Sequence, residues 1–163
     1  MIKLNSFIAL VIAGSIPLSG LCATEAVVSI SATVTKECNV AVDTKTVNFG
    51  SQTGFNIDKF PDRTVSVTSN CAGGTGKLTF LASESEGNNI VLSSGASDSN
   101  KLKVNFKIAD KADHTFDSSN KIVYSVGQGN VVTKLTLKPA DGQNVNVIAG
   151  EYKGTLQINV DVV

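Results

Sequence analysis

The sequence predicts an all-β protein with an immunoglobulin-like β-sandwich fold. Three observations predict it: apolar and polar residues alternate over most of the chain, turn-forming residues separate the alternating runs, and one cysteine pair, Cys38 and Cys71, falls inside this pattern. No stretch carries apolar residues at helical spacing with a convincing cap. The 163 residues favour a single domain. The chain has no Trp, so it lacks the tryptophan that packs on the disulfide of true immunoglobulin domains.

The first 23 residues have the layout of a secretory signal peptide. Lys3 supplies a positive charge, residues 7–16 form a short apolar run, and Ala23 offers a small residue at the cleavage point. A transmembrane anchor is the alternative, but the apolar run is short for a bilayer. We therefore expect residues 1–23 to be removed during export.

Cleavage leaves Cys38 and Cys71 as the cysteines of the mature chain. A single pair in an exported chain predicts a disulfide, which contributes roughly 3–4 kcal/mol in the chain-entropy model. Cys71 shares its parity with Val65 and Val67, so its sulfur is expected to point toward the core. The C-x-x-C spacing of redox-active pairs is missing.

The strands expected from the alternation follow one another along the mature chain. In order they are residues 26–34, 38–42, 47–49, 65–71, 78–82, 102–108, 122–126, 131–137, 145–147 and 156–162. Turns are expected at residues 43–45, 73–76, 87–89, 93–95, 127–130 and 141–142, which are rich in Gly, Asn, Asp and Ser. The last strand alternates most cleanly.

Composition excludes several classes of function. Charge is balanced, with 14 Lys+Arg against 14 Asp+Glu, so nothing indicates nucleic-acid binding. One His and three Cys are too few for a zinc ribbon or finger. The histidine, His114, lies in a polar stretch without a marked nucleophile, and we interpret it as a solvated loop residue. We predict that the protein is not an enzyme and uses no metal or other cofactor.

Two terminal segments carry functional information. Residues 26–34 precede the cysteine-bounded loop and are strictly amphipathic, so they form either an ordinary first strand or a strand that is given to another subunit. The pattern alone leaves both open. Residues 156–162 form an apolar strand with no charged tail, and such an edge invites pairing with a further strand.

The chain resembles pilins assembled by the chaperone–usher pathway, and most closely the Dr/Afa and aggregative-adherence (AAF) fimbrial adhesin family. The resembling pieces are VTKECNVAV around Cys38, LKVNFKIADKADHTFDSSNKIVY at residues 102–124, and AGEYKGTLQINV at residues 149–160. Their order matches the family pattern: a signal peptide, an alternating N-terminal segment, two early cysteines, and a final amphipathic strand after a Gly-x-Tyr element, here Gly150-Glu151-Tyr152.

The resemblance implies an incomplete sandwich that is completed by a donor strand from a neighbouring subunit. Residues 36–163 would form the pilin domain and residues 24–35 the donor strand. The donor side chains would be Ala26, Val28, Ile30, Ala32 and Val34, and the acceptor groove would be lined partly by Leu156, Ile158, Val160 and Val162.

The resemblance also implies partners and a location. The partners are identical or related fimbrial subunits in a head-to-tail polymer, a periplasmic chaperone, an outer-membrane usher, and a host-cell surface or matrix protein receptor, with no nucleic acid. The chain would be exported through the periplasm to a fimbrium on the cell surface.

Three functions stay open at this point. The first is an adhesive fimbrial subunit. The second is a non-adhesive rod pilin or a spore-coat-U-like subunit. The third is a self-contained secreted immunoglobulin-like binding module. The lysine-bearing face of residues 101–107 is a candidate receptor surface, although the pattern favours an ordinary solvated strand face.

Overall fold

The computed structural model describes residues 29–94, 101–110, 114–143 and 148–163. The chain divides into two compact units, residues 1–32 and residues 33–163. In the first unit, the described residues 29–32 are exposed and belong to no strand. In the second unit, the described elements are β1 (Glu37–Val42), η1 (a 3-10 helix, Gly54–Lys59), β2 (Arg63–Ala72), β3 (Gly76–Ala82), β4 (Ser85–Glu86), β5 (Asn89–Ser93), β6 (Lys101–Ile108), β7 (Lys121–Val126), β8 (Gly129–Pro139) and β9 (Leu156–Val162).

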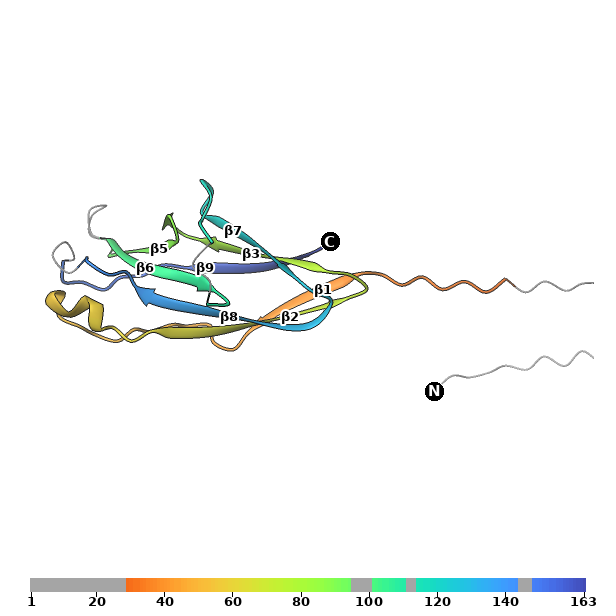
Figure 1. The fold of residues 1–163 in the computed structure, drawn as a ribbon, viewed down its shortest axis with the longest axis horizontal. Coiled ribbons are helices and arrows are strands. Elements are labelled where there is room, and N and C mark those ends of the chain that lie inside the picture. Colours follow the sequence, from red (N-terminus) through yellow and green to blue (C-terminus); the bar gives the residue numbers. More distant parts are fainter. Residues whose placement is uncertain (1–28, 95–100, 111–113, 144–147) are drawn as a thin grey trace, which may run out of the picture. The chain divides into compact units, whose positions relative to one another are not determined.

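The strands form two antiparallel sheets that pack face to face (Figure 1). One sheet has six strands in the order β1-β2-β8-β6-β5-β4, and the other has three in the order β7-β3-β9. Among the described strands, the chain crosses to the three-stranded sheet for β3, for β7 and for β9, and it returns to the six-stranded sheet at β4 and at β8. This is the immunoglobulin-like sandwich predicted from the alternation, and it is incomplete because no strand among the described residues pairs with the outer side of β1 or of β9.

The core lies between the two sheets and is built by the alternation seen in the sequence. Every second residue of β2, β3 and β6 is buried, while the residues between them face outward. Three aromatic rings meet at its centre: Phe80 and Phe106 have centroids 5.6 Å apart, and Phe106 and Phe116 are 5.5 Å apart. These spacings are those of favourable tilted aromatic pairs.

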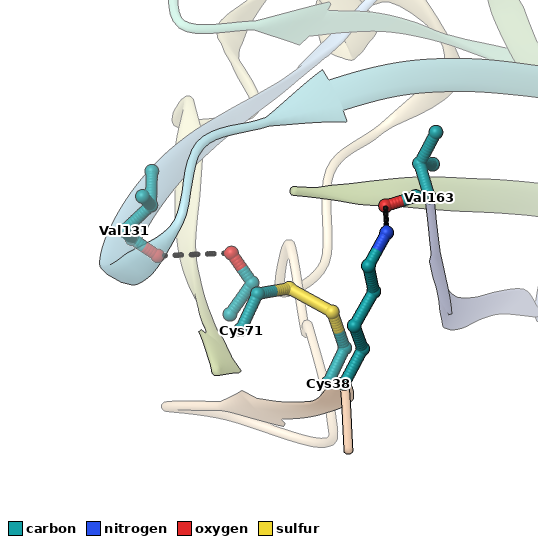
Figure 2. Close-up of a disulfide and its surroundings, with 6 residues drawn as sticks. Cys38, Cys71, Val131 and Val163 are labelled. Carbon is teal, nitrogen blue, oxygen red and sulfur yellow. Dashed lines mark hydrogen bonds between the residues drawn. A yellow bond between two sulfur atoms is a disulfide. The ribbon is translucent and has the colours of Figure 1, made fainter. Parts of the chain in front are cut away.

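The disulfide is present and joins neighbouring strands of one sheet (Figure 2). Cys38 of β1 lies directly opposite Cys71 of β2, with a Cα–Cα distance of 4.1 Å. Such a short separation is typical of a non-hydrogen-bonded antiparallel pair. Gly76 lies against both sulfurs, because a Cβ added there would be 2.6 Å from Cys71 Sγ and 3.1 Å from Cys38 Sγ.

One local prediction was wrong, and two local features were missed. Residues 47–49 form no strand, although Val47 and Phe49 still turn half-buried side chains to the core. The pair β4–β5 was missed, because Ile90 and Val91 are both buried and the run therefore does not alternate. The short helix η1 was also missed, since six residues are too few to show a helical period. The strand predicted at residues 145–147 lies outside the described residues.

Candidate functional site: an apolar groove between two free strand edges

The free edge of β9 exposes the backbone groups of its apolar residues. At the two ends of the β3–β9 ladder, Ser83 N donates to Thr155 O and Val163 N donates to Thr75 O, both at 2.9 Å. Hydrogen-bonded pairs alternate along an antiparallel ladder, so the odd-numbered residues of β9 bond to β3. The N–H and C=O groups of the even-numbered residues therefore point away from β3. Those residues are Leu156, Ile158, Val160 and Val162.

The free edge of β1 is built in the same way. Asp43 N donates to Ser66 O at 3.1 Å, which places the odd-numbered residues in hydrogen-bonded pairs with β2. The backbone groups of Cys38, Val40 and Val42 therefore point to the free side. The same three residues turn half-buried side chains to the core.

An apolar groove lies between these two edges. Its cavity volume is about 1190 Å³. Apolar side chains that line it come from both edges and from the strands beneath: Val40, Val42, Val65, Ile90, Leu92, Leu102, Val104, Leu135, Leu137, Leu156 and Ile158. The loop of residues 44–52 and the segment 150–155 line it further. The groove is larger than most small-molecule pockets, and it combines apolar walls with free strand edges, which suits an extended polypeptide.

One end of the groove is closed where β1 begins and β9 ends. Lys36 Nζ donates a hydrogen bond to Val163 O at 3.2 Å (Figure 2). The Gly73–Gly74 turn lies next to this contact, since a Cβ added to Gly74 would be 3.1 Å from Lys36 Cδ and 3.2 Å from Val163 O. Because the start of β1 meets the end of β9, the two strands run in opposite directions along the groove.

The other end of the groove is bordered by the Gly-x-Tyr segment. Lys153 pairs with Ser93 through two backbone hydrogen bonds of 3.0 Å. Gly154 passes close over β5, because a Cβ there would be 2.6 Å from Leu92 Cδ2. This close approach gives a physical reason for glycine at position 154.

The structure places the predicted acceptor residues unequally. Leu156 and Ile158 line the groove. Val160 is half-buried against the core but is not among the lining residues, and Val162 is 41% exposed. All four nevertheless present their backbone groups at the free edge, as the ladder parity requires.

The predicted donor residues that the structure describes are exposed. Ile30 is 92% exposed and Val34 is 85% exposed, and Ala32 is exposed as well. Residues 29–36 belong to no strand. Ala26 and Val28 lie outside the described residues, as does the predicted signal peptide.

The sequence did not identify the floor of the groove. Val65, Leu102 and Leu135 lie in strands that the alternation predicted, but nothing in their pattern separates a core residue under a groove from one under a strand. The closed end was missed for another reason, because Lys36 and Val163 are 127 residues apart in sequence.

His114 differs from its interpretation as a solvated loop residue. Its ring is half-buried and meets Tyr124 edge-on, with centroids 5.6 Å apart. Its Nε2 atom is buried without a hydrogen-bond partner among the described residues. Within the same part of the chain, no group of three or more metal-binding side chains occurs, and no helix is long and apolar enough to cross a membrane.

Comparisons with known proteins identify the family. Residues 25–162 match the family model described as fimbrial protein. Because the match covers most of the chain, the chain belongs to the fimbrial protein family. No curated protein sequence matched it.

A solved structure shares the fold. It is a chain of the crystal structure of the CsuC–CsuE chaperone–tip adhesion subunit pre-assembly complex from archaic chaperone-usher Csu pili of Acinetobacter baumannii. The TM-score is 0.51 at 17% sequence identity, and the alignment covers 79% of this chain and 40% of that chain. The present chain thus spans well under half the length of that relative, and the similarity is one of fold.

Proposed function

We propose that the chain is a structural and adhesive subunit of a surface fimbria that polymerises by donor-strand exchange. The observation that carries the proposal is the groove between β1 and β9, with apolar walls and two rows of backbone groups that have no strand partner in the part of the chain that the structure describes. One inserted strand would satisfy both features at once. Membership of the fimbrial protein family supports the same reading.

Residues 24–35 are the proposed donor strand, and their pattern fits the groove. Ala26, Val28, Ile30, Ala32 and Val34 would face its apolar walls. The residues between them, which are hydroxylic except for Val27, would face outward. Each Val or Ile side chain would contribute about 1.5–3 kcal/mol when it becomes fully buried. The high exposure of Ile30 and Val34 leaves this contribution available for an intermolecular contact.

The assembly partners in this proposal are a periplasmic chaperone and an outer-membrane usher. A chaperone would cover the groove during folding, and the usher would be the place where the next subunit's residues 24–35 replace it. The proposal rests on the family and on the fold shared with a chaperone-bound pilus complex. It includes export through residues 1–23 and a final location in a fimbrium on the cell surface.

Relocation of the donor segment tests the proposal. Three proteins are compared: the mature chain, the chain without residues 24–35, and the chain with that segment moved behind Val163 through a short flexible linker. We expect polymer ladders from the mature chain, an unstable product from the deletion, and a stable monomer with a raised melting temperature from the relocation. A mature chain that is already a stable monomer, and that relocation only damages, would favour the self-contained binding module.

Adhesion is the second part of the proposal and needs its own test. The relocated monomer is measured for binding to host cells and to immobilised matrix proteins, and saturable binding is expected. Absence of binding would favour the non-adhesive rod pilin or the spore-coat-U-like subunit. On the candidate receptor face, Lys101 pairs with Glu84 and Lys103 with Glu86. Charge there is partly neutralised, so receptor binding is not expected to depend on electrostatics alone.

A further inference from the structure

The closed end of the groove lies beside residues 35–36, through which the N-terminal segment joins β1. The contact of Lys36 with Val163 and the Gly73–Gly74 turn beside it are called the clasp below. Resting on the proposed function, we propose that the clasp is a specificity device that directs residues 24–35 to the groove of a second copy and away from the groove of their own molecule.

Chain connectivity is the first step of the argument. Residues 24–35 are joined through Lys36 to β1, which is itself one edge of the groove. To enter its own groove, the segment must reverse direction at residues 33–36 and run back along β1. It would then be antiparallel to β1 and parallel to β9, because β1 and β9 run in opposite directions.

A segment from a second copy has no such restriction. It can enter antiparallel to β9, whose free edge has seven residues against six for β1. Antiparallel pairing is slightly more stable per residue than parallel pairing. The intermolecular arrangement therefore offers the better ladder along the longer edge.

The local sequence and the clasp both oppose the reversal. Residues 33–36 are Thr-Val-Thr-Lys, with three β-branched residues and none of the Gly, Asn, Asp or Pro that form tight turns. The backbone at this point also rests on Gly73, since a Cβ there would be 3.4 Å from Thr35 O and 3.5 Å from Lys36 Cα. A reversal at Lys36 would move Thr35 and Lys36 away from Gly73. It would also break the hydrogen bond from Lys36 Nζ to Val163 O.

The effect of the clasp on the ratio of monomer to polymer can be estimated from the hydrogen bond between Lys36 and Val163. Lys36 is exposed, so its hydrogen bond contributes less than a buried charged one. A contribution of about 1 kcal/mol corresponds to a five-fold change in the ratio of self-completed monomer to polymer. A turn-forming sequence at the same place should change the ratio further.

The experiment compares full mature chains with the disulfide formed and refolded at low concentration. Thr35→Asn with Lys36→Gly replaces the clasp by an Asn-Gly turn. Lys36→Met removes the donor alone, and Lys59→Met is the matched control at another exposed lysine. Size-exclusion chromatography with light scattering gives the monomer fraction, and hydrogen exchange gives the protection of residues 24–35 in the monomer.

We expect the Asn-Gly variant to form a monomer in which residues 24–35 are protected, with polymer yield reduced at least about five-fold. Lys36→Met should shift the ratio in the same direction by a smaller amount, and Lys59→Met should behave as wild type. Protection in the wild-type monomer, or unchanged ratios in both Lys36 variants, would overturn the proposed role of the clasp.

A peptide of residues 24–35 separates this failure from failure of the proposed function. It is added to the full mature chain carrying Ile30→Asp, which weakens the resident segment. Saturable binding supports the groove as an acceptor of this strand, and the refolding ratios then decide the role of the clasp. If the peptide does not bind, the donor-strand function itself fails, and the clasp proposal fails with it.

Discussion

Substitution of Gly76 by alanine should destabilise the protein mainly through a clash with the disulfide. The added Cβ would be 2.6 Å from Cys71 Sγ, a distance that real Cβ atoms essentially never show, and a tight 3.1 Å from Cys38 Sγ. Gly76 is buried in β3, so the methyl group cannot turn to solvent. Overpacking of this kind costs about 1–3 kcal/mol of the free energy of unfolding.

A double-mutant cycle isolates the contact. Replacing both cysteines by alanine removes the two sulfurs and should itself cost about 3–4 kcal/mol, which a domain of typical stability survives. The nearest remaining atom to the new Cβ is then Val126 Cγ2 at 3.2 Å. In this background Gly76→Ala should cost less than about 1 kcal/mol, so the coupling energy should exceed about 1 kcal/mol.

Urea unfolding of the monomer fraction measures all four proteins. Equal costs of Gly76→Ala in both backgrounds, within about 0.5 kcal/mol, would refute the reasoning. The penalty would then come from the backbone of β3 and not from the sulfurs. An unchanged slope of free energy against urea shows that the compared states are the same.

Three further predictions concern the groove, a turn and acid stability. Ile158→Asn should weaken binding of the residue 24–35 peptide at least about ten-fold in fluorescence titration, since it removes an apolar groove wall, whereas the outward-facing neighbour Asn159→Ser should leave the affinity unchanged. Asn120→Ala should lower the free energy of unfolding by about 1–3 kcal/mol in urea, because Asn120 has φ +57° and its side chain accepts two hydrogen bonds from Ser85; equal stability would contradict this. Hydrogen bonds from the backbone and hydroxyl of Ser66 lower the pKa of Asp43, so its contribution is present above pH 3.8 and is lost as the pH falls through the lower folded-state pKa. In the Asp43→Asn variant, the melting temperature should therefore decrease less as the pH is lowered. If it decreases as much as in the wild type, Asp43 makes no such contribution to stability.

Strand positions were predictable wherever one face of a strand is buried. Strands β1, β2, β3 and β6–β9 alternate because the core takes every second side chain. The pattern fails at β5, where Val91 is buried although it has the outward parity, opposite Lys103. It also fails at Val47 and Phe49, which alternate as a strand but find no strand partner among the described residues.

Only one part of the candidate site, its β9 edge, was predictable from the sequence. The alternation of residues 156–162 indicated an apolar strand in need of a neighbour, and the free backbone groups of Leu156 and Ile158 agree with this. The floor and the closed end of the groove depend on which strands lie side by side. Contacts such as that between Lys36 and Val163 join residues whose neighbourhood only the folded topology creates.

The position of the disulfide has a mechanical consequence. A pull on the N-terminal segment reaches β1 at Glu37, and one residue later it reaches Cys38, which is bonded covalently to β2. Tension therefore bypasses the ladder between β1 and β2 and enters a strand that is paired on both sides. The disulfide therefore prevents β1 from separating from β2 one residue at a time, starting at its N-terminal end. The ladder that then carries the load is the nine-pair ladder between β2 and β8.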